Sequence, residues 1–407
     1  MGGDIPISGI TSAQLLDGTH KLSVTVDGST ITTKLDGNQI DQRTDSSFSK
    51  GFIGFREDFA GNVDESADIK KVKVTSKGGD VLLDTDFTNG NPFNGGTVTP
   101  AGLHVGNRKD VLLQTNDSNK PLLRTEFTTT PGKTIRSARA YASAHGVYEL
   151  QLNGETVGDQ HLAPGWTDYK KRIQAQTYDV TSQVNNGANA FGAEVGDGWW
   201  AGKVGMWGPG MYSSTLGLIA QLRIDYTDGT HQVVKTDDSW TSHFGPYKAA
   251  DNIDGETYDA NAEQPGWDRP NYDDSDWNAV TVAPSTDTAK LEPQTDEPVR
   301  VTQELPALKR TESPGVAKGF IYDLGQNMVG VARMRISGKA GQTIKFRYAE
   351  ELYKDGRFYV GNLRAAKVTD YYTFKTTGTV VYTPKFTQHG FRYIEISGVD
   401  TAPSSRT

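Results

Sequence analysis

Short runs of alternating apolar and polar residues, separated by Asp-Gly or Asn-Gly turns, constrain the fold of this chain most. One run spans residues 20–26 (HKLSVTV) before Asp27-Gly28, and another spans 147–152 before Asn153-Gly154. A period of two places one face of a strand on a core and the other in solvent. Glycine in these turns accepts the positive φ of a tight hairpin. Similar runs, such as residues 69–75 and 217–226, continue to residue 396, and no stretch of a dozen residues carries a helical period. The pattern predicts an all-β chain of three consecutive antiparallel β-sandwiches of jelly-roll-like form.

The composition limits the number of domains and the possible partners. The chain has 407 residues, which at roughly 100–200 residues per domain corresponds to two to four domains. It has no cysteine, which excludes disulfides, thiol catalysis and cysteine-ligated metal sites. The net charge of −8 argues against nucleic acid as a partner, because binding to phosphates requires clustered Lys and Arg.

The location of the protein stays open at this stage. No stretch approaches 18 consecutive apolar residues, so a transmembrane helix and a membrane partner are not expected. The first residues (MGGDIPISG) lack the basic and apolar regions of a signal peptide. This fits a cytoplasmic protein and equally a piece of a longer, secreted one.

Changes in pattern along the chain indicate the domain limits. A second block of strands begins near residue 110, and a linker-like segment rich in Pro, Thr and Asp (282–298) precedes a third block. We therefore expect domains at 1–112, 113–290 and 291–401, with residues 402–407 beginning a linker.

A glycine-rich stretch that contains three tryptophans is the strongest candidate for a binding site. Residues 196–212 contain Trp199, Trp200 and Trp207 together with Asp197, and Trp166 precedes them. The C–H faces of sugars stack on indole rings, and carboxylates accept hydrogen bonds from sugar hydroxyls, so the stretch predicts a carbohydrate platform. The alternative is that the indoles close the ends of a sandwich as large buried apolar groups.

An acidic run at residues 251–259 suggests a second type of site. Its carboxylates Asp254, Glu256 and Asp259 have the ligand chemistry of calcium, which takes six to eight oxygens. The spacing does not match an EF-hand, and we favour a solvated or turn-forming role.

The sequence shows no other sign of a catalytic or metal site. The seven histidines are scattered, and we interpret them as surface or packing residues. The chain has neither a G-x-S-x-G nor an H-E-x-x-H motif.

Longer motifs carry a resemblance to a known family. They are residues 146–154 (GVYELQLNG), 157–169 (VGDQHLAPGWTDY), 196–200 (GDGWW), 254–260 (DGETYDA), 322–330 (YDLGQNMVG), 348–351 (YAEE), 362–367 (NLRAAK) and 389–393 (HGFRY). In this order and spacing, residues 110–400 resemble the N-terminal region of bacterial α-L-rhamnosidases of glycoside hydrolase family 78.

The resemblance implies a role for each part of the chain. Residues 113–290 look like the rhamnose-binding sandwich, which in some members holds L-rhamnose through a calcium ion. Asp159 and Gln160 match its metal ligands best, although Gln stands where Asn is expected. Residues 291–401 look like the sandwich that precedes the catalytic (α/α)₆ barrel. The acidic D-E-R-x-G-W motif of that barrel does not occur, so the barrel is expected to be absent from this chain.

The first 112 residues resemble something different. Residues 20–28, 35–37 and 50–56 are similar to later strands of a concanavalin-like or laminin-G-like jelly roll. Such domains usually run well over a hundred residues, so this domain is expected to be partial and the chain to be truncated at both ends.

The sequence therefore predicts a non-catalytic portion of an α-L-rhamnosidase. The expected partners are terminal L-rhamnose of glycans or glycosides and the catalytic barrel of the same parent protein, and calcium is the expected cofactor. The residues expected to bind carbohydrate are Asp159, Gln160, Trp166, Asp197, Trp199, Trp200 and Trp207. No catalytic residue is assigned. Two alternatives stay open: the chain itself cleaves rhamnosides, or its sandwiches only support the barrel.

Overall fold

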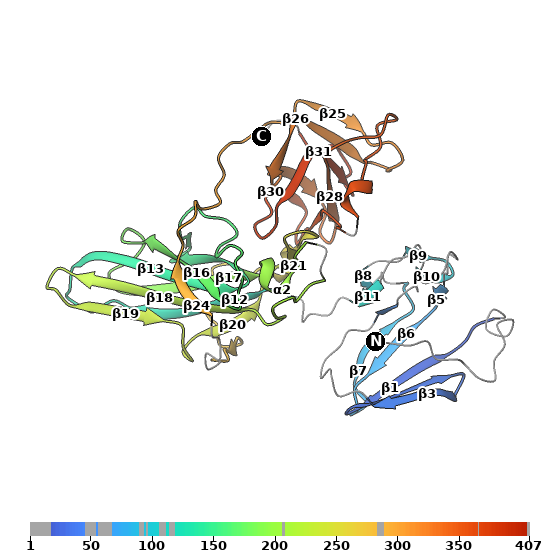
Figure 1. The fold of residues 1–407 in the computed structure, drawn as a ribbon, viewed down its shortest axis with the longest axis horizontal. Helices are drawn as coiled ribbons and strands as arrows, with labels where there is room; N and C mark the ends of the chain where they lie inside the picture. The colour runs from blue at the N-terminus through green and yellow to red at the C-terminus, as the bar shows by residue number, and fades with distance from the viewer. Residues whose placement is uncertain are drawn as a thin grey trace. The chain divides into compact units, whose positions relative to one another are not determined.

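The computed structural model describes residues 18–44, 54–55, 67–88, 93–94, 97–105, 111–113, 119–205, 208–282, 289–364 and 366–404. Strands dominate these ranges, and the helices are single turns, namely α2 (Gly198–Ala201), η2 (Ala260–Ala262) and η3 (Gly361–Leu363) (Figure 1). Within the same ranges no helix is long or apolar enough to cross a bilayer, and no helical barrel occurs. The predicted all-β sandwich class is confirmed. The chain divides into two compact units, residues 1–116 and 117–407.

The first unit consists of small antiparallel sheets. One sheet has the order β1 (Leu22–Asp27), β2 (Thr30–Leu35), β3 (Asn38–Thr44), and a hairpin joins β6 (Val72–Thr75) to β7 (Val81–Thr85). The remaining two sheets have the orders β5 (Ala67–Ile69), β10 (Gly102–Val105), β9 (Thr97–Thr99) and β4 (Gly54–Phe55), β11 (Val111–Leu113), β8 (Phe93–Asn94). Its small core centres on Phe87, Leu103 and Val105.

The second unit begins with a sandwich of two sheets. The six-stranded sheet has the order β15 (Glu155–Thr156), β14 (Val147–Leu152), β17 (Ala188–Gly196), β12 (Pro121–Thr128), β20 (Thr241–Phe244), β23 (Asn278–Ala279). The five-stranded sheet has the order β19 (His231–Lys235), β18 (Gly217–Tyr226), β13 (Ile135–His145), β16 (Arg172–Asp179), β24 (Lys290–Pro293). Alternate residues of both sheets form one core, because every second side chain of a strand points inward.

A second sandwich follows in the same unit. Its large sheet has the order β21 (Tyr247–Asp251), β22 (Gly255–Asp259), β29 (Thr369–Thr373), β28 (Thr343–Ala349), β31 (His389–Ser397), β26 (Phe320–Gly330), β25 (Lys309–Glu312). The opposite layer is the pair β27 (Met334–Gly338) and β30 (Gly378–Tyr382). Ile336 of this pair packs with Phe346 and Ile396 of the large sheet in the core.

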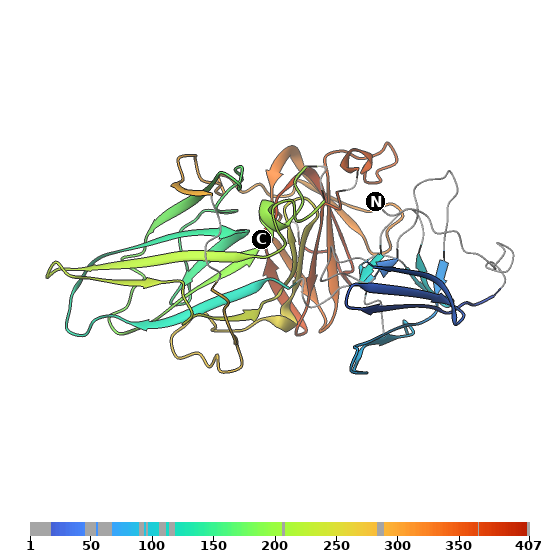
Figure 2. The same ribbon diagram turned by 60° about the horizontal axis from the view of Figure 1, so that its bottom comes forward.

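The hairpin β21–β22 connects the two sandwiches. It follows β20 of the first sandwich in the chain, yet β22 pairs in parallel with β29 of the second. The close approach requires glycine at position 255, where φ is +111° and a Cβ would lie 2.2 Å from the Thr369 carbonyl oxygen. Helix α2, green in both views, lies where the strands of the two sandwiches meet (Figures 1 and 2).

Two segments differ from the sequence prediction. Residues 69–75 were expected to form one strand, but β5 and β6 belong to different sheets, because their partners β10 and β7 come from different parts of the chain. The segment 282–298 was expected to be a linker, but it contains β24, which extends the five-stranded sheet. The predicted domain limits stay predictions.

Candidate carbohydrate-binding site

The loop between β15 and β16 presents Trp166 to solvent. Trp166 is 55% exposed, whereas the other five tryptophans that the structure describes are buried or half-buried. Its Nε1 donates to Tyr212 Oη over 3.3 Å, and the loop is anchored by Tyr169 Oη, which donates to the Gly165 carbonyl over 2.7 Å. The loop therefore holds an exposed indole against a second ring, as stacking of a sugar requires.

Trp200 lies in the same aromatic cluster but is engaged by its neighbours. It stacks on His145 with ring centroids 3.7 Å apart and nearly parallel planes, and its centroid lies 5.9 Å from that of Tyr212. Its Nε1 donates to the Thr215 carbonyl over 2.9 Å. One indole face is thus already covered, and the residue supports Tyr212 and, through it, Trp166.

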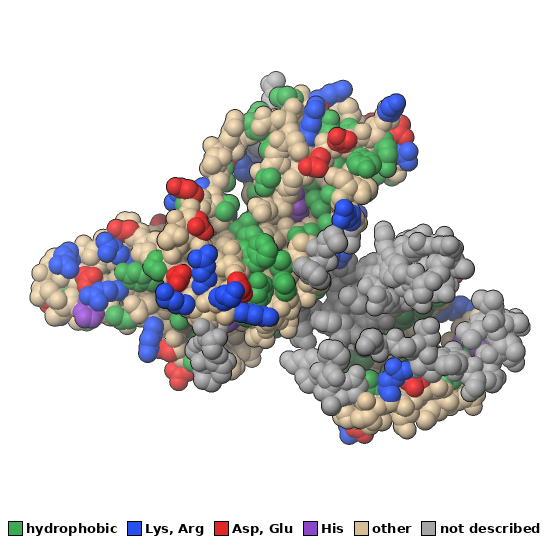
Figure 3. Space-filling view, viewed as in Figure 1, with side chains coloured by type: hydrophobic (Ala, Val, Ile, Leu, Met, Phe, Trp, Pro, Cys, Tyr) green, Lys and Arg blue, Asp and Glu red, His purple; other side chains and the backbone are tan. Residues whose placement is uncertain are grey.

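Trp199 and Asp197 occupy structural positions beside α2. Trp199 packs against the cluster that contains Val147, Tyr247 and Phe386. Lys120 Nζ lies 2.6 Å from the Asp197 carboxylate, and burial raises the pKa of this carboxyl group against the opposing effect of Lys120. Hydrophobic side chains gather on the visible face around α2 (Figure 3). Trp207 lies outside the described residues.

Asp159 and Gln160 lie beside a segment that follows β24. Arg300 Nε is 2.7 Å from the Asp159 carboxylate, and this hydrogen bond lowers the pKa of the exposed carboxyl group. Gln160 Nε2 donates to Gln294 Oε1 over 2.7 Å, and Gln176 donates to the same oxygen. Both predicted ligands are therefore engaged by residues 294–300.

The residues expected to bind calcium do not fit the ion as they lie. Calcium takes six to eight oxygens, mostly from carboxylates and carbonyls, whereas the Asp159 carboxylate faces a guanidinium. In the described ranges no three His, Asp or Glu residues are grouped as a metal site requires. No step of the function proposed below depends on a metal.

The acidic run forms turns and ion pairs. Asp251 Oδ1 accepts the amides of Ile253 and Asp254, each over 2.8 Å, while Lys203 Nζ lies 2.8 Å from Asp254 Oδ2. These local contacts agree with the turn-forming role that we favoured from the sequence. Glu256, the middle carboxylate of the run, is different because none of its surface is exposed.

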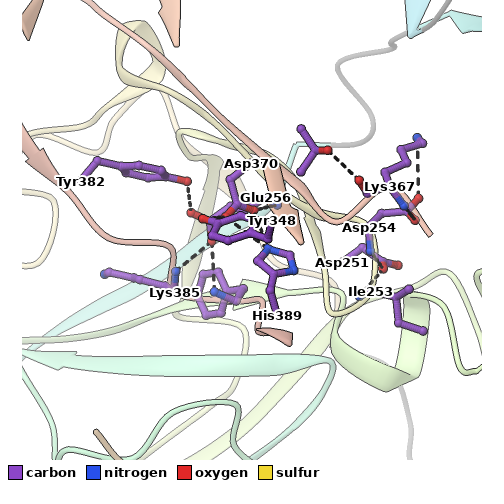
Figure 4. Close-up of polar contacts among 12 residues, drawn as sticks. Asp251, Ile253, Asp254, Glu256, Tyr348, Lys367, Asp370, Tyr382, Lys385 and His389 are labelled. Atoms are coloured by element: carbon purple, nitrogen blue, oxygen red, sulfur yellow. Dashed lines mark hydrogen bonds and ion pairs between the residues drawn. The ribbon is translucent and has the colours of Figure 1, made fainter. Parts of the chain in front are cut away.

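A buried polar network around Glu256 holds the connecting hairpin β21–β22 on the second sandwich, and it was not predicted from the sequence (Figure 4). Tyr382 Oη donates to Glu256 Oε1 over 2.8 Å, and the backbone amides of Lys385 and Phe386 donate to Oε2 over 3.0 Å. The Glu256 amide donates to Asp370, which is also fully buried. The motif 254–260 contained the only sequence signal, and nothing in it distinguished a buried carboxylate from an exposed one.

Lys385 provides a second link in this junction. Its Nζ lies 2.6 Å from Glu149 Oε1 on β14 and 2.8 Å from Glu194 Oε2 on β17. A lysine from the loop between β30 and β31 thus bridges two neighbouring strands of the first sandwich. Next to it, Phe386 packs with Val147.

Comparison with protein families identifies both sandwiches. Residues 133–303 match the α-L-rhamnosidase N-terminal domain, and residues 316–407 match the bacterial α-L-rhamnosidase concanavalin-like domain. The chain carries two domains of the α-L-rhamnosidase family. The resemblance seen in the sequence is confirmed. The description "concanavalin-like" falls on the second sandwich, and the similar likeness of residues 1–112 stays a prediction.

Individual α-L-rhamnosidases agree with this assignment. One from Streptomyces avermitilis is 51% identical over 284 residues, and one from Formosa agariphila is 42% identical over 271 residues. These matches cover 70% and 66% of this chain but only 27% and 29% of the relatives. The chain therefore spans less than a third of the length of these two relatives.

Solved α-L-rhamnosidase structures share the fold. The S. avermitilis enzyme complexed with L-rhamnose matches with a TM-score of 0.67 and 49% identity, over 70% of this chain and 28% of the enzyme. The enzyme from Aspergillus terreus matches with a TM-score of 0.65 and 26% identity, over 96% of this chain and 48% of the enzyme.

Proposed function

We propose that the first sandwich binds terminal L-rhamnose of glycans or glycosides at the surface around Trp166. In this proposal the chain is a non-catalytic part of an α-L-rhamnosidase, and the second sandwich supports the catalytic barrel of the parent protein. The exposed Trp166 ring carries the proposal, because an indole face that is open to solvent can stack on the apolar face of a sugar. The rhamnose complex of the S. avermitilis relative supports the choice of sugar.

The arrangement assigns different roles to the predicted residues. Trp166 stacks on the sugar, while Tyr212 and Trp200 hold the indole in place. Asp159 and Gln160 hydrogen-bond to sugar hydroxyls through their carboxylate and amide groups. The sugar hydroxyls then replace Arg300 and Gln294 as their partners. Trp199 and Asp197 stabilise the sandwich and do not contact the ligand.

Titration calorimetry with L-rhamnose tests the proposal. We expect weak binding to the full chain, and a loss of about tenfold or more in W166A, which is about 1.4 kcal/mol of binding free energy. Y353A is the matched control, because it removes an aromatic ring of 47% exposure from the second sandwich. L-mannose, which differs by a hydroxyl on C6, tests whether the methyl group is recognised.

Three outcomes would change the interpretation. Equal binding by W166A and the unaltered chain would remove Trp166 from the site. If no heat is released at millimolar rhamnose, the proposal that the chain binds rhamnose is wrong. Support of the catalytic barrel is then the function that remains. Turnover of an aryl α-L-rhamnoside by the purified chain would assign catalysis to the chain itself. Repeating the titration with a chelator and with added calcium tests the calcium hypothesis separately.

A further inference from the structure

Two carboxyl groups lie next to each other in the buried junction between the sandwiches. Glu256 is on β22 and Asp370 on β29, the parallel neighbours that connect the hairpin β21–β22 to the large sheet. Neither residue has exposed surface, and the Glu256 amide donates to Asp370 Oδ1 over 2.8 Å (Figure 4). A buried pair of like charges is costly, because water does not screen their repulsion.

The surrounding groups do not balance two negative charges. They are Tyr247 on β21, Tyr348 on β28, Tyr382 on β30, His389 on β31, Lys385 in the loop before β31, and Glu149 and Glu194 on β14 and β17. The Lys385 ammonium is already shared by Glu149 and Glu194. The His389 imidazole contacts Asp370, and no cationic side chain in the described ranges forms an ion pair with Glu256.

The hydrogen bonds show which carboxyl group can hold a proton. Asp370 accepts from the Glu256 amide and from Tyr348 Oη over 2.6 Å, and His389 Nε2 lies 3.2 Å from its carboxyl oxygens, so both oxygens are already engaged. Glu256 Oε2 accepts two amides, but Oε1 faces only the Tyr382 hydroxyl, which can accept as well as donate. A proton therefore fits on Glu256 Oε1 without loss of a hydrogen bond.

We propose that protonated Glu256, beside the buried Asp370, is a pH-dependent latch that holds the hairpin β21–β22 on β29. Loss of the proton in mildly alkaline solution places two buried negative charges side by side. The hairpin then separates from β29 more often, and the junction between the sandwiches loosens. The latch does not depend on whether the first sandwich binds a sugar.

Two further observations support the latch. Burial, followed by the charge of Asp370, raises the pKa of Glu256 to about 8, so the proton is lost in an accessible range. The ladder between β22 and β29 has three registered pairs, from Thr257–Tyr371 to Asp259–Thr373, whereas β13 and β18 pair over ten positions. The short ladder is the part of the junction that extra repulsion opens most easily.

Hydrogen exchange of the full chain across about pH 6.5 to 9, corrected for the intrinsic rate, tests the latch. We expect the open fraction of residues 247–259 to rise by up to about tenfold per pH unit below the pKa of Glu256 and to level off above it, while residues 138–144 of β13 stay protected. E256Q should remove this dependence, because an amide reproduces the donor and acceptor pattern of the protonated acid. D323N, which alters an ion pair with Arg392 away from the junction, is the matched control.

Two results would overturn the latch. One is constant protection of the hairpin over this pH range, and the other is the same pH dependence in E256Q and the unaltered chain. Infrared spectroscopy gives a test that does not require the variant to fold well. The unaltered chain should show the band of a protonated carboxyl group at neutral pH and lose it in alkaline solution, and a missing band would also refute the proposal.

Discussion

Replacing Lys385 by methionine should strongly destabilise the second unit. The substitution keeps the length of the side chain but removes the ammonium between Glu149 and Glu194, whose side chains are only 15% and 11% exposed. Removing one partner of a buried ion pair costs about 3–5 kcal/mol, and an exposed pair contributes less than about 1 kcal/mol. Because the Lys385 side chain is 33% exposed, we expect a loss of about 2–3 kcal/mol.

Urea unfolding followed by tryptophan emission measures this loss. All seven tryptophans lie between residues 166 and 277, so their emission reports on the second unit and not on residues 1–116. With a slope of about 3 kcal/mol per molar urea, the midpoint should fall by about 1 M. The triple variant E149Q/E194Q/K385M is the control, and it should recover most of the loss because no buried charge is left unpaired.

The pH dependence of the stability lost in K385M gives a second test of the same reasoning. Burial already raises the pKa of Glu194, and removal of Lys385 should raise it further. The folded variant then keeps protons that the unfolded chain releases above about pH 4.5, so its stability falls as the pH rises from there. The difference from the unaltered chain should be small near pH 4 and largest near neutrality. A stability loss below about 0.5 kcal/mol at neutral pH would refute a stabilising ion pair between Lys385 and the two glutamates. A loss near pH 4 that equals the loss at neutral pH would refute it too.

Three further predictions concern single positions. G255A should lower the free energy of unfolding by about 2 kcal/mol or more, measured by thermal melting, because its Cβ would meet the Thr369 carbonyl at 2.2 Å; a smaller loss would show that β22 can shift. W200A should reduce both thermal stability and rhamnose affinity, because it removes the support of Tyr212, whereas W166A should reduce affinity alone. R300A should raise the pKa of Asp159 toward its ordinary value in an NMR titration and strengthen any calcium binding; an unchanged pKa would contradict the ion pair.

The strands and turns could be predicted from the sequence because their signals are local. The run at residues 20–26 became β1, and the run at 217–226 became β18 with the same bounds. In each case the alternation and the next turn lie within a few residues of each other. Local signals failed where a partner came from elsewhere, as with β24, whose pairing with β16 turned part of an expected linker into an edge strand.

The candidate site shows the same limit. The sequence identified the tryptophans by type, but only neighbouring elements determine which ring is exposed. His145 covers a face of Trp200 from β13, and the cluster of Val147, Tyr247 and Phe386 receives Trp199, so Trp166 is the exposed indole among the tryptophans that the structure describes. Arg300 lies 141 positions from the Asp159 carboxylate that it contacts, a separation that no local pattern reveals.

The sequence by itself determined the all-β class, the positions of most hairpins and the likeness to α-L-rhamnosidases, because alternation, turn residues and long motifs are properties of neighbouring positions. Only the tertiary structure decided that Glu256 is buried while Asp254 forms an ion pair with Lys203, although a single residue separates them in one acidic run. The hairpin β21–β22 leaves its own sandwich and pairs with β29, and this long-range contact removes Glu256 from water and places it beside Asp370. The charge state of a carboxyl group depends on that environment, which sequence spacing does not encode.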